Sequence, residues 1–556
     1  MNFLENIFSN LDKAASRAVL QEARESGLVA ATGSELRSKI ETTREFVRGA
    51  GLKKGDRCAL LAPNSIRWAA LDLGLIAEGI IAVPLNTRQT PKELAAMARD
   101  AEARLVCVGD AAGANAIREE LPAGSRIATY DEVFGASDGK TPNGVKASPP
   151  VAMADSDCVT IIYTSGTSGE PKGVVLTLGN ITFMQERIAA RLDQLMSGYS
   201  GVERVFHYPP FNFAGSWMML LAGLSRNSVM TLSMDLTRLQ KEMQVAAPHY
   251  FMNVPLLLER VRRGIEENIS KGGGIIANIF NRARAAWFAR HSEVQTGATG
   301  GGGIWLAIAR TAIFPTIRKR IGANLKALIC GSAPLSRDTQ LFFMMIGIPV
   351  LQVYGLTETT AICTMDDPAR VEPGWVGPAI PGIEMKLGVD QEILVRGPNI
   401  FPGYWKRPEE TAKVLRDGWF HSGDQGEVNA NRNWRIIGRI KNLLVLSSGH
   451  NVAPEPIEEQ LLGELRGAQQ VVLVGHGRSY LTAIITGEVP RERVGAALES
   501  LNAQAPHYKR IHGFHVEREG FTMESGMLTA NGKLRRDKIS ARFAAQIDAL
   551  YREKSA

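Results

Sequence analysis

The chain has 556 residues, of which 45% are hydrophobic and 22% are charged. One hydrophobic core rarely organises so long a chain, and this composition excludes a largely disordered protein. The 64 Lys and Arg against 57 Asp and Glu leave a formal charge of +7, spread along the chain without a long basic block. This balance favours anionic small molecules or weak attraction to an acidic membrane surface, and it does not indicate nucleic-acid binding.

The first hundred residues alternate between helical and strand-like patterns. Helices are predicted at Leu36–Ala50 and Trp68–Ile80, and Pro91 opens another helix at its first turn. Apolar runs bounded by turn residues predict strands at Arg57–Leu61, Ile81–Leu85 and Leu105–Val108. Strands that alternate with helices in this way predict an α/β fold with a mostly parallel sheet.

Residues 272–303 contain two glycine clusters around a basic amphipathic stretch with Arg282, Arg284, Trp287 and Arg290. Two interpretations are open. The stretch is either a mobile surface insertion or a membrane-facing element near an acyl entrance.

The last part of the chain has a different pattern. After Arg439 short alternating strands and charged helices follow each other, and a terminal helix is predicted from Asp537. We therefore predict a large N-terminal domain over residues 1–440 and a smaller α+β domain over residues 441–556.

Cysteine spacing and hydropathy indicate the compartment. The five cysteines are isolated, so neither a disulfide framework nor a zinc site is expected, and a reducing compartment is the simplest interpretation. The segment 1–13 lacks a basic start before an apolar run, and no apolar stretch reaches the ~20 residues that a bilayer span needs. We expect a cytoplasmic protein, soluble or peripheral at the inner face of the membrane.

The most informative segment runs from Ile161 to Gly173, with the sequence IIYTSGTSGEPKG. A β-branched strand leads into a loop of glycines and hydroxyl residues that ends at Lys172. Glycines let backbone N–H groups point inward, hydroxyls add donors and Lys172 adds positive charge, which together suit a polyphosphate. The spacing differs from that of a Walker loop, and Gly173 follows the lysine where such a loop has Ser or Thr.

With this segment the chain resembles the adenylate-forming superfamily of acyl-CoA synthetases, luciferase-like enzymes and peptide-synthetase adenylation domains. The resemblance recurs in order down the chain, at LQVYGLTE (351–358), WFHSGD (419–424), GRIK (438–441) and TANGKLRR (529–536). Segments RGPNIFPGYW (396–405) and NVAPEPI (451–457) are closest to long-chain fatty acyl-CoA synthetases. The family fold implied is a large domain of mostly parallel sheets with a small β-barrel-like part, followed by a small mobile α+β domain.

The resemblance assigns roles to individual residues. Lys533 is the implied catalytic lysine, Glu358 and Thr167 the implied catalytic and Mg²⁺ residues, and Lys441 the implied hinge. The implied ATP-binding residues are Thr164, Ser165, Gly166, Thr167, Ser168, Gly169, Lys172, Gly331, Ser332, Ala333, Pro334, Tyr354, Gly355, Thr357, Asp424 and Arg439.

The residues next to the acid and the acceptor are less specific. Phe211 is followed by Asn212, where the family often has His near the substrate carboxylate. The implied acyl and coenzyme A residues are Phe211, Asn212, Phe213, Gly215 and Gly449. The aromatic residues of this segment, which include Trp217, are equally compatible with a plain core role. At the hinge, Asn442 replaces the acidic residue that often follows the lysine.

The function that the resemblance implies is ATP-dependent activation of a long-chain fatty acid, followed by transfer to coenzyme A. ATP, Mg²⁺ and coenzyme A are the implied cofactors, the fatty acid is the partner, and the state is monomer or homodimer. Three alternatives stay open: an acceptor that is a carrier protein, an aryl or medium-chain acid, and a nucleotide-binding pseudoenzyme. Nothing in the sequence points to the specialised substrate of a luciferase-type oxygenase.

Overall fold

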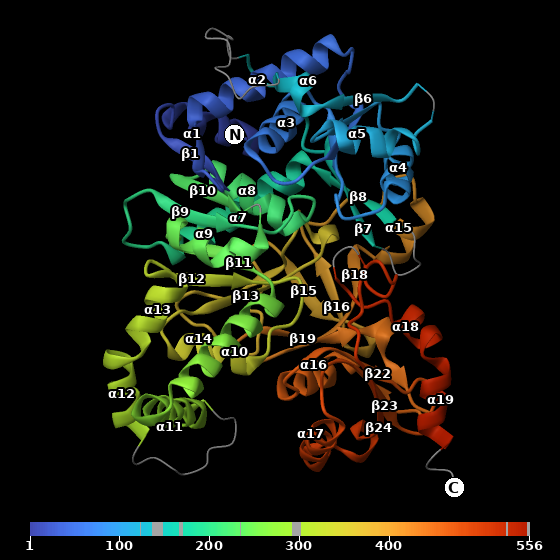
Figure 1. The fold of residues 1–556 in the computed structure, drawn as a ribbon. Coiled ribbons are helices and arrows are strands. Elements are labelled where there is room, and N and C mark those ends of the chain that lie inside the picture. The colour runs from blue at the N-terminus through green and yellow to red at the C-terminus, as the bar shows by residue number, and fades with distance from the viewer. Residues whose placement is uncertain are drawn as a thin grey trace. The chain divides into compact units, whose positions relative to one another are not determined.

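The computed structural model describes residues 1–122, 124–135, 148–165, 171–233, 235–291, 302–529 and 532–552 (Figure 1). The chain divides into two compact units. The larger unit comprises Met1–Met385, Val395–Phe420 and Ala430–Trp434, and the smaller comprises Lys386–Leu394, His421–Asn429 and Arg435–Ala556.

A six-stranded sheet of the larger unit has the order β6-β5-β3-β4-β7-β8. Only the pair β7–β8 is antiparallel, and the other neighbours run parallel. The strands are β3 (Arg57–Leu61), β4 (Ile81–Pro84), β5 (Leu105–Val108), β6 (Arg126–Thr129), β7 (Cys158–Ser165) and β8 (Pro171–Thr177). The helices of this part are α3 (Ile66–Ala77), α4 (Pro91–Asp100), α5 (Ala111–Arg118), α6 (Tyr130–Phe134) and α7 (Leu178–Leu195).

Local sequence explains where these helices begin. Thr90 caps α4 by accepting from the Glu93 N–H, Glu93 reaches back to the Thr90 N–H, and Pro91 occupies the first turn. Helix α3 is apolar on nearly every side, and nearly all of its residues are buried. It therefore packs inside the unit rather than on its surface.

An eight-stranded sheet of the same unit has the order β14-β13-β12-β11-β9-β10-β1-β2. Its strands are β1 (Ala18–Arg24), β2 (Gly27–Thr32), β9 (Glu203–His207), β10 (Ser228–Ser233), β11 (Tyr250–Asn253), β12 (Ala327–Cys330), β13 (Val350–Tyr354) and β14 (Thr364–Met365). The accompanying helices are α1 (Phe3–Lys13), α2 (Gly33–Gly49), α8 (Ala214–Leu224), α9 (Leu239–Ala246) and α14 (Arg337–Met345). The parallel strands β11, β12 and β13 end at the same edge of the sheet.

Four helices between β11 and β12 form what we call the helical arm, residues 255–322 (Figure 1). They are α10 (Pro255–Gly272), α11 (Gly274–Arg290), α12 (Gly302–Ala312) and α13 (Phe314–Gly322). The inner side of the arm joins the apolar core of the sheet, where Phe280 meets Phe342 of α14 with ring centroids 6.3 Å apart. The described part of the predicted insertion is thus helical and anchored in the core.

The remaining strands of the first 440 residues form a five-stranded sheet with the order β15-β16-β18-β17 and with β19 paired to β18. These strands are β15 (Glu384–Leu387), β16 (Glu392–Arg396), β17 (Leu415–Arg416), β18 (Trp419–Val428) and β19 (Trp434–Arg439), and α15 (Pro408–Val414) precedes β17.

The smaller unit contains a three-stranded sheet with the order β22-β23-β24 and a short hairpin β20–β21. Its strands are β20 (Leu444–Val445), β21 (Asn451–Val452), β22 (Ala468–Val474), β23 (Leu481–Gly487) and β24 (Ile511–Glu517). Its helices are α16 (Pro454–Glu464), α17 (Arg491–Gln504), α18 (Arg536–Arg542) and α19 (Ala544–Arg552). β23 is buried along its whole length and forms the centre of this sheet. No helix in the described ranges is long and apolar enough to cross a membrane.

Candidate active site

The strands β7 and β8 frame the predicted phosphate loop. They pair antiparallel, with Thr164 opposite Lys172 and Ser165 opposite Pro171. Gly166, Thr167, Ser168 and Gly169 lie outside the described residues, as do the details of the Ser165 side chain. The hairpin therefore brings the two ends of the loop together.

Lys172 has two partners in the larger unit. Its ammonium forms an ion pair with Glu410 of α15 and lies 5.3 Å from the centroid of the Tyr404 ring. The hydrogen bond and charge of Lys172 lower the pKa of the Glu410 carboxyl. Lys172 is thus held between an aromatic face and a carboxylate.

Glu358 contacts the same tyrosine. The Tyr404 hydroxyl donates to Glu358 Oε1 over 2.8 Å, and the backbone carbonyl of Glu358 accepts from the Phe401 N–H. The Trp405 N–H donates to the Gly173 carbonyl, which fixes the Gly-Tyr-Trp segment beside β8. One ring therefore brings together Lys172 and Glu358, two predicted site residues far apart in the chain.

Two of the predicted ATP-binding residues are glycines in crowded positions. A Cβ on Gly355 would lie 2.3 Å from the Ala361 carbonyl oxygen, and a Cβ on Gly331 would lie 2.6 Å from Val353 Cγ2. Larger residues do not fit at either position. Gly331 follows β12 and Tyr354 ends β13, so both lie at the same edge of the parallel sheet.

The predicted residues of these loops differ in exposure. Ser332, Ala333 and Pro334 are exposed, whereas Tyr354 and Thr357 are half-buried. The loop side chains are therefore accessible to a ligand.

The segment after β9 combines core and accessible residues. Phe211 is buried, stacks on His207 with ring centroids 5.0 Å apart, and donates its N–H to Asn64 Oδ1. Trp217 is also buried and donates to Asp72 Oδ2 over 2.8 Å. Phe211 and Trp217 thus belong to the core.

The other predicted residues of this segment are more accessible. Asn212, Phe213 and Gly215 are half-buried. They are therefore the better candidates for contact with an acid.

In the smaller unit Asp424 and Arg439 form an ion pair. Arg439 Nε lies 2.8 Å from Asp424 Oδ1, and the guanidinium also donates to the Ser422 carbonyl. Asp424 lies on β18 and is buried, and its N–H donates to Ser422 Oγ. The carboxylate is therefore fixed in orientation, as a group that accepts from two ribose hydroxyls must be.

Two lysines, Lys441 and Lys533, lie within electrostatic range of this pair. The pKa of Lys441 is lowered to about 8. Desolvation has the largest effect, followed by repulsion from the charges of Arg439 and Lys533. Lys533 is exposed and follows a tight turn in which Gly532 has φ +73° and donates its N–H to the Thr529 carbonyl. The smaller unit thus places the predicted hinge lysine, catalytic lysine and ribose pair within electrostatic range of one another.

The predicted acceptor loop and the hinge have their own contacts in this unit. Gly449 is exposed with φ +82°, in the turn of the β20–β21 hairpin. Asn442 donates to Glu455 Oε1 over 2.6 Å, so the residue that replaces the usual acid has a carboxylate partner on α16.

The profile of the AMP-binding enzyme family matches residues 11–405, and the profile of the AMP-binding enzyme C-terminal domain matches residues 441–555. The chain belongs to the AMP-binding enzymes. The resemblance inferred from its motifs is confirmed. The boundary predicted after residue 440 stays a prediction.

Similar proteins cover this AMP-binding enzyme almost end to end. The long-chain-fatty-acid–CoA ligase FadD15 of Mycobacterium bovis is 27% identical, over 94% of this chain and 92% of that protein. The chloroplastic long-chain-fatty-acid–[acyl-carrier-protein] ligase AEE15 of Arabidopsis thaliana is 25% identical, over 98% and 86%.

A solved structure gives the fold. The crystal structure of an anthranilate CoA ligase with anthranoyl-AMP is similar with a TM-score of 0.75 at 18% identity, over 98% of both chains. The predicted fold class, an α/β protein with a large N-terminal and a smaller C-terminal domain, is confirmed.

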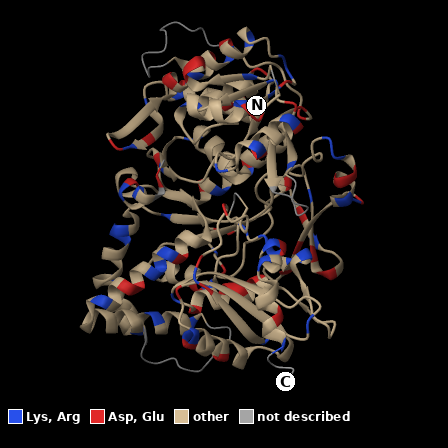
Figure 2. Ribbon diagram, turned by 45° about the vertical axis from the view of Figure 1, so that its right-hand side comes forward, with Lys and Arg blue, Asp and Glu red and all other residues tan. Residues whose placement is uncertain are grey.

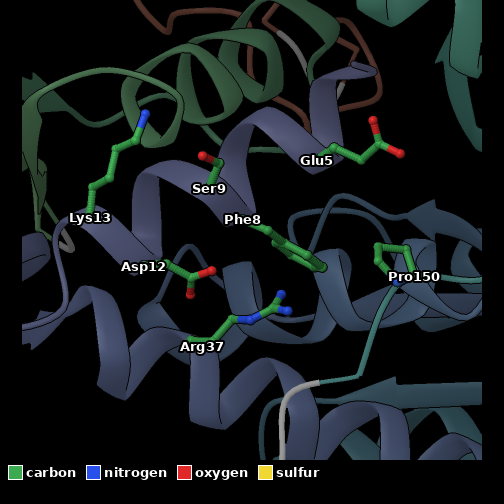
Figure 3. A pocket seen from close by; sticks show the side chains of 7 residues that line it. All are labelled: Glu5, Phe8, Ser9, Asp12, Lys13, Arg37 and Pro150. Atoms are coloured by element: carbon green, nitrogen blue, oxygen red, sulfur yellow. The ribbon is translucent and has the colours of Figure 1, made fainter.

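A surface pocket lies away from these residues. It has a volume of about 590 Å³ and lies between α1 and α2, beside the stacked pair Arg37 and Phe8 (Figure 3). It contains none of the predicted site residues of this AMP-binding enzyme, and it is open and shallow, so we assign it no catalytic role. Within the described residues no group of three or more His, Cys, Asp or Glu side chains could bind a metal ion by itself.

Tyr404 and Glu410 are the site neighbours that sequence reasoning missed. Tyr404 lies in segment 396–405, whose sequence resembles long-chain fatty acyl-CoA synthetases but does not by itself assign a role to the tyrosine. Its hydroxyl donates to Glu358, so this segment positions a predicted site residue. Glu410 gave no signal, because a glutamate in the first turn of a helix is ordinarily a solvated residue.

Proposed function

We propose that this AMP-binding enzyme is a long-chain-fatty-acid–CoA ligase that forms an acyl-adenylate from ATP and a fatty acid and then transfers the acyl group to coenzyme A. The observation that carries the phosphate chemistry is the grouping of Lys172 and Glu358 on Tyr404. The choice of acid is supported by the relative named as a long-chain-fatty-acid–CoA ligase.

In the first half-reaction a carboxylate oxygen of the acid attacks the α-phosphorus of ATP. A new C(O)–O–P bond forms, the bond from the α-phosphorus to the bridging oxygen breaks, and pyrophosphate leaves. Lys172 and the loop before it would bind the β- and γ-phosphates, and Lys533 would contact the carboxylate and the α-phosphate. Asp424 would accept from the ribose hydroxyls, with Arg439 as a second contact.

The oxygen donors of Glu358 and Thr357 suit a hard cation, and Glu358 is held in place by Tyr404. With Thr167, Glu358 would hold Mg²⁺, which when bound offsets negative charge on the leaving pyrophosphate. In the second half-reaction the thiol sulfur of coenzyme A attacks the acyl carbon and AMP leaves. A turn of the smaller domain at Lys441 would replace Lys533 by the Gly449 hairpin between the two steps.

A carrier protein is the second candidate acceptor, because one relative is named as an acyl-carrier-protein ligase. An aryl or medium-chain acid as substrate, and a nucleotide-binding pseudoenzyme, are the remaining alternatives. We propose a cytoplasmic enzyme, monomer or homodimer, with peripheral contact at the inner membrane face.

The test is pyrophosphate release with Mg-ATP over a panel of acids from acetate to oleate, each with coenzyme A, with a phosphopantetheinylated carrier protein, or with neither. The expected result is a maximum at long chains and formation of acyl-CoA with AMP. Adenylation without use of coenzyme A would move the proposal to the carrier protein. No release with any acid would overturn the enzymatic assignment, and K172M is the negative control.

A further inference from the structure

The net positive charge of the protein is concentrated in the helical arm. Residues 255–322 contain eleven Lys and Arg and four Asp and Glu, a difference of +7. Since the whole chain has 64 basic and 57 acidic residues, the rest of it has 53 of each and no net charge. What appeared in the sequence as an evenly spread charge is the charge of one structural element.

Two acidic residues of the arm, Glu259 and Glu266, make internal contacts. Glu266 accepts from Arg284 over 2.8 Å and pairs with Arg262, and Glu259 accepts from the Ser336 hydroxyl. Both carboxylates are half-buried. The inner side of the arm therefore uses its negative charges to fasten α10 to α11 and to the start of α14.

The outer side is left strongly basic. Lys and Arg positions recur along the helices of the arm (Figure 2). Among the described residues of the arm, Glu267 is the one exposed acid, against eight exposed bases. These bases are Arg260, Lys271, Arg282, Arg290, Arg310, Arg318, Lys319 and Arg320. Such an excess is costly to keep on a small surface unless an anionic partner offsets it.

Aliphatic side chains are exposed among these cations. Ile275 is 78% exposed, Ile276 is 59% exposed, and both directly follow Lys271 and its glycines. Ile304 at the start of α12 is 64% exposed. Exposure of these isoleucine side chains to water is unfavourable, and covering them with an apolar phase would lower the free energy of the system.

The tryptophans of the arm lie under two of the cations. Arg282 lies 4.6 Å from the Trp305 ring and Arg310 lies 5.9 Å from the Trp287 ring. Trp287 also donates its indole N–H to the Leu341 carbonyl of α14. Cations, indoles and free isoleucines on one pair of helices are the mixture that an interfacial helix presents to a lipid headgroup layer.

We propose that the outer side of α11 and α12, with Lys271 and α13, is a docking surface for an anionic lipid bilayer. Charge complementarity gives the attraction, and Ile275, Ile276 and Ile304 enter the boundary between headgroups and acyl chains. Nucleic acid would use the same cations, but it offers no apolar phase for three exposed isoleucines. The surface is inferred from charge and exposure alone, and it goes beyond the proposed catalytic function by naming where the enzyme meets a membrane.

The test is co-sedimentation with vesicles of phosphatidylcholine containing roughly a third phosphatidylglycerol, at an ionic strength of about 0.1 M. The full chain should bind these vesicles, bind pure phosphatidylcholine weakly, and be released by salt. K271Q/R290Q/K319Q removes three exposed charges and should weaken binding about a hundredfold, at about fivefold per charge. I275S/I276S keeps every charge and should weaken it about tenfold.

The matched control is K53Q/K92Q/R118Q, which removes three exposed charges outside the arm. It should bind like the wild type. Equal loss in this control, wild-type binding that ignores lipid charge, or binding to a homopolymer RNA in preference to vesicles would each overturn the proposal.

Pyrophosphate release with soluble octanoate separates the two proposals. The arm variants should keep that activity, so lost vesicle binding with intact adenylation supports the surface. A wild type that binds vesicles but adenylates no acid would sink the proposed function and leave the surface standing.

Discussion

Tyr404→Phe isolates one contact of the candidate site. The substitution removes the hydroxyl that donates to Glu358 Oε1 over 2.8 Å, and it keeps the ring that faces Lys172. A hydrogen bond to a charged group contributes about 1.5–3 kcal/mol. Tyr404 and Glu358 are both half-buried, so water competes for the carboxylate and the lower end of this range applies.

About 1.5 kcal/mol corresponds to a fall of roughly tenfold in kcat/KM for adenylation. Tyr404→Leu goes further, because it also removes the ring beneath Lys172 and the edge contact with Phe401, whose centroid lies 4.9 Å away. The contact with Lys172 and the contact with Phe401 each contribute about 0.5–1 kcal/mol. We therefore expect a further fall in kcat/KM for adenylation of roughly fivefold to thirtyfold.

The assay is steady-state pyrophosphate release at several Mg²⁺ concentrations, together with a thermal unfolding midpoint. Tyr199→Phe is the control, because Tyr199 also loses one hydroxyl donation, to the Val202 carbonyl. The reasoning is refuted if Tyr404→Phe releases pyrophosphate like the wild type. It is equally refuted if both tyrosine variants are impaired alike, since the effect would then not come from Glu358.

Three further outcomes are expected. Lys533→Ala should abolish adenylation but leave transfer from supplied acyl-adenylate to coenzyme A largely intact, and equal loss of both steps would remove its special role. Glu358→Gln should lower pyrophosphate release in a way that high Mg²⁺ partly restores, and an unchanged Mg²⁺ dependence would contradict its place at the metal. Burial raises the pKa of Asp72 to about 7, although the hydrogen bond from Trp217 acts in the opposite direction. Between about pH 4 and pH 7 the folded state therefore keeps a proton on Asp72 that the unfolded chain has released. Wild-type stability should therefore fall by up to about 4 kcal/mol between pH 4 and pH 7 through this group, and urea unfolding of Asp72→Asn should show that part of the slope missing.

Local pattern predicts the strands of the first sheet well. The predictions at Arg57–Leu61 and Leu105–Val108 agree with β3 and β5 at both ends, because each is a short apolar run between turns. The helix predicted at Trp68–Ile80 is α3, which begins at Ile66 because Ser65 caps it. It ends before Gly79, whose φ of +69° is left-handed.

Contacts between distant segments were beyond sequence reasoning. Tyr404 reaches Glu358 across 46 residues, and only the pairing of the Gly403–Trp405 segment with β8 creates that contact. Asp72 is a single acid within the apolar helix α3, and its carboxyl group is the buried partner of the Trp217 indole. Both contacts depend on which surfaces of distant segments pack together after folding. The hydrophobic periodicity within one segment does not encode that information.

The electrostatics of the smaller unit support a site for an anion. Arg439 and Lys533 both act on Lys441, and Asp424 partly offsets them. Their mutual repulsion disfavours the charged form of Lys441 and lowers stability wherever all three are charged. A phosphate ligand would offset that repulsion and so raise the pKa of Lys441, while the larger effect of burial would remain. The crowding of these three side chains therefore fits the ATP-binding role better than a structural one.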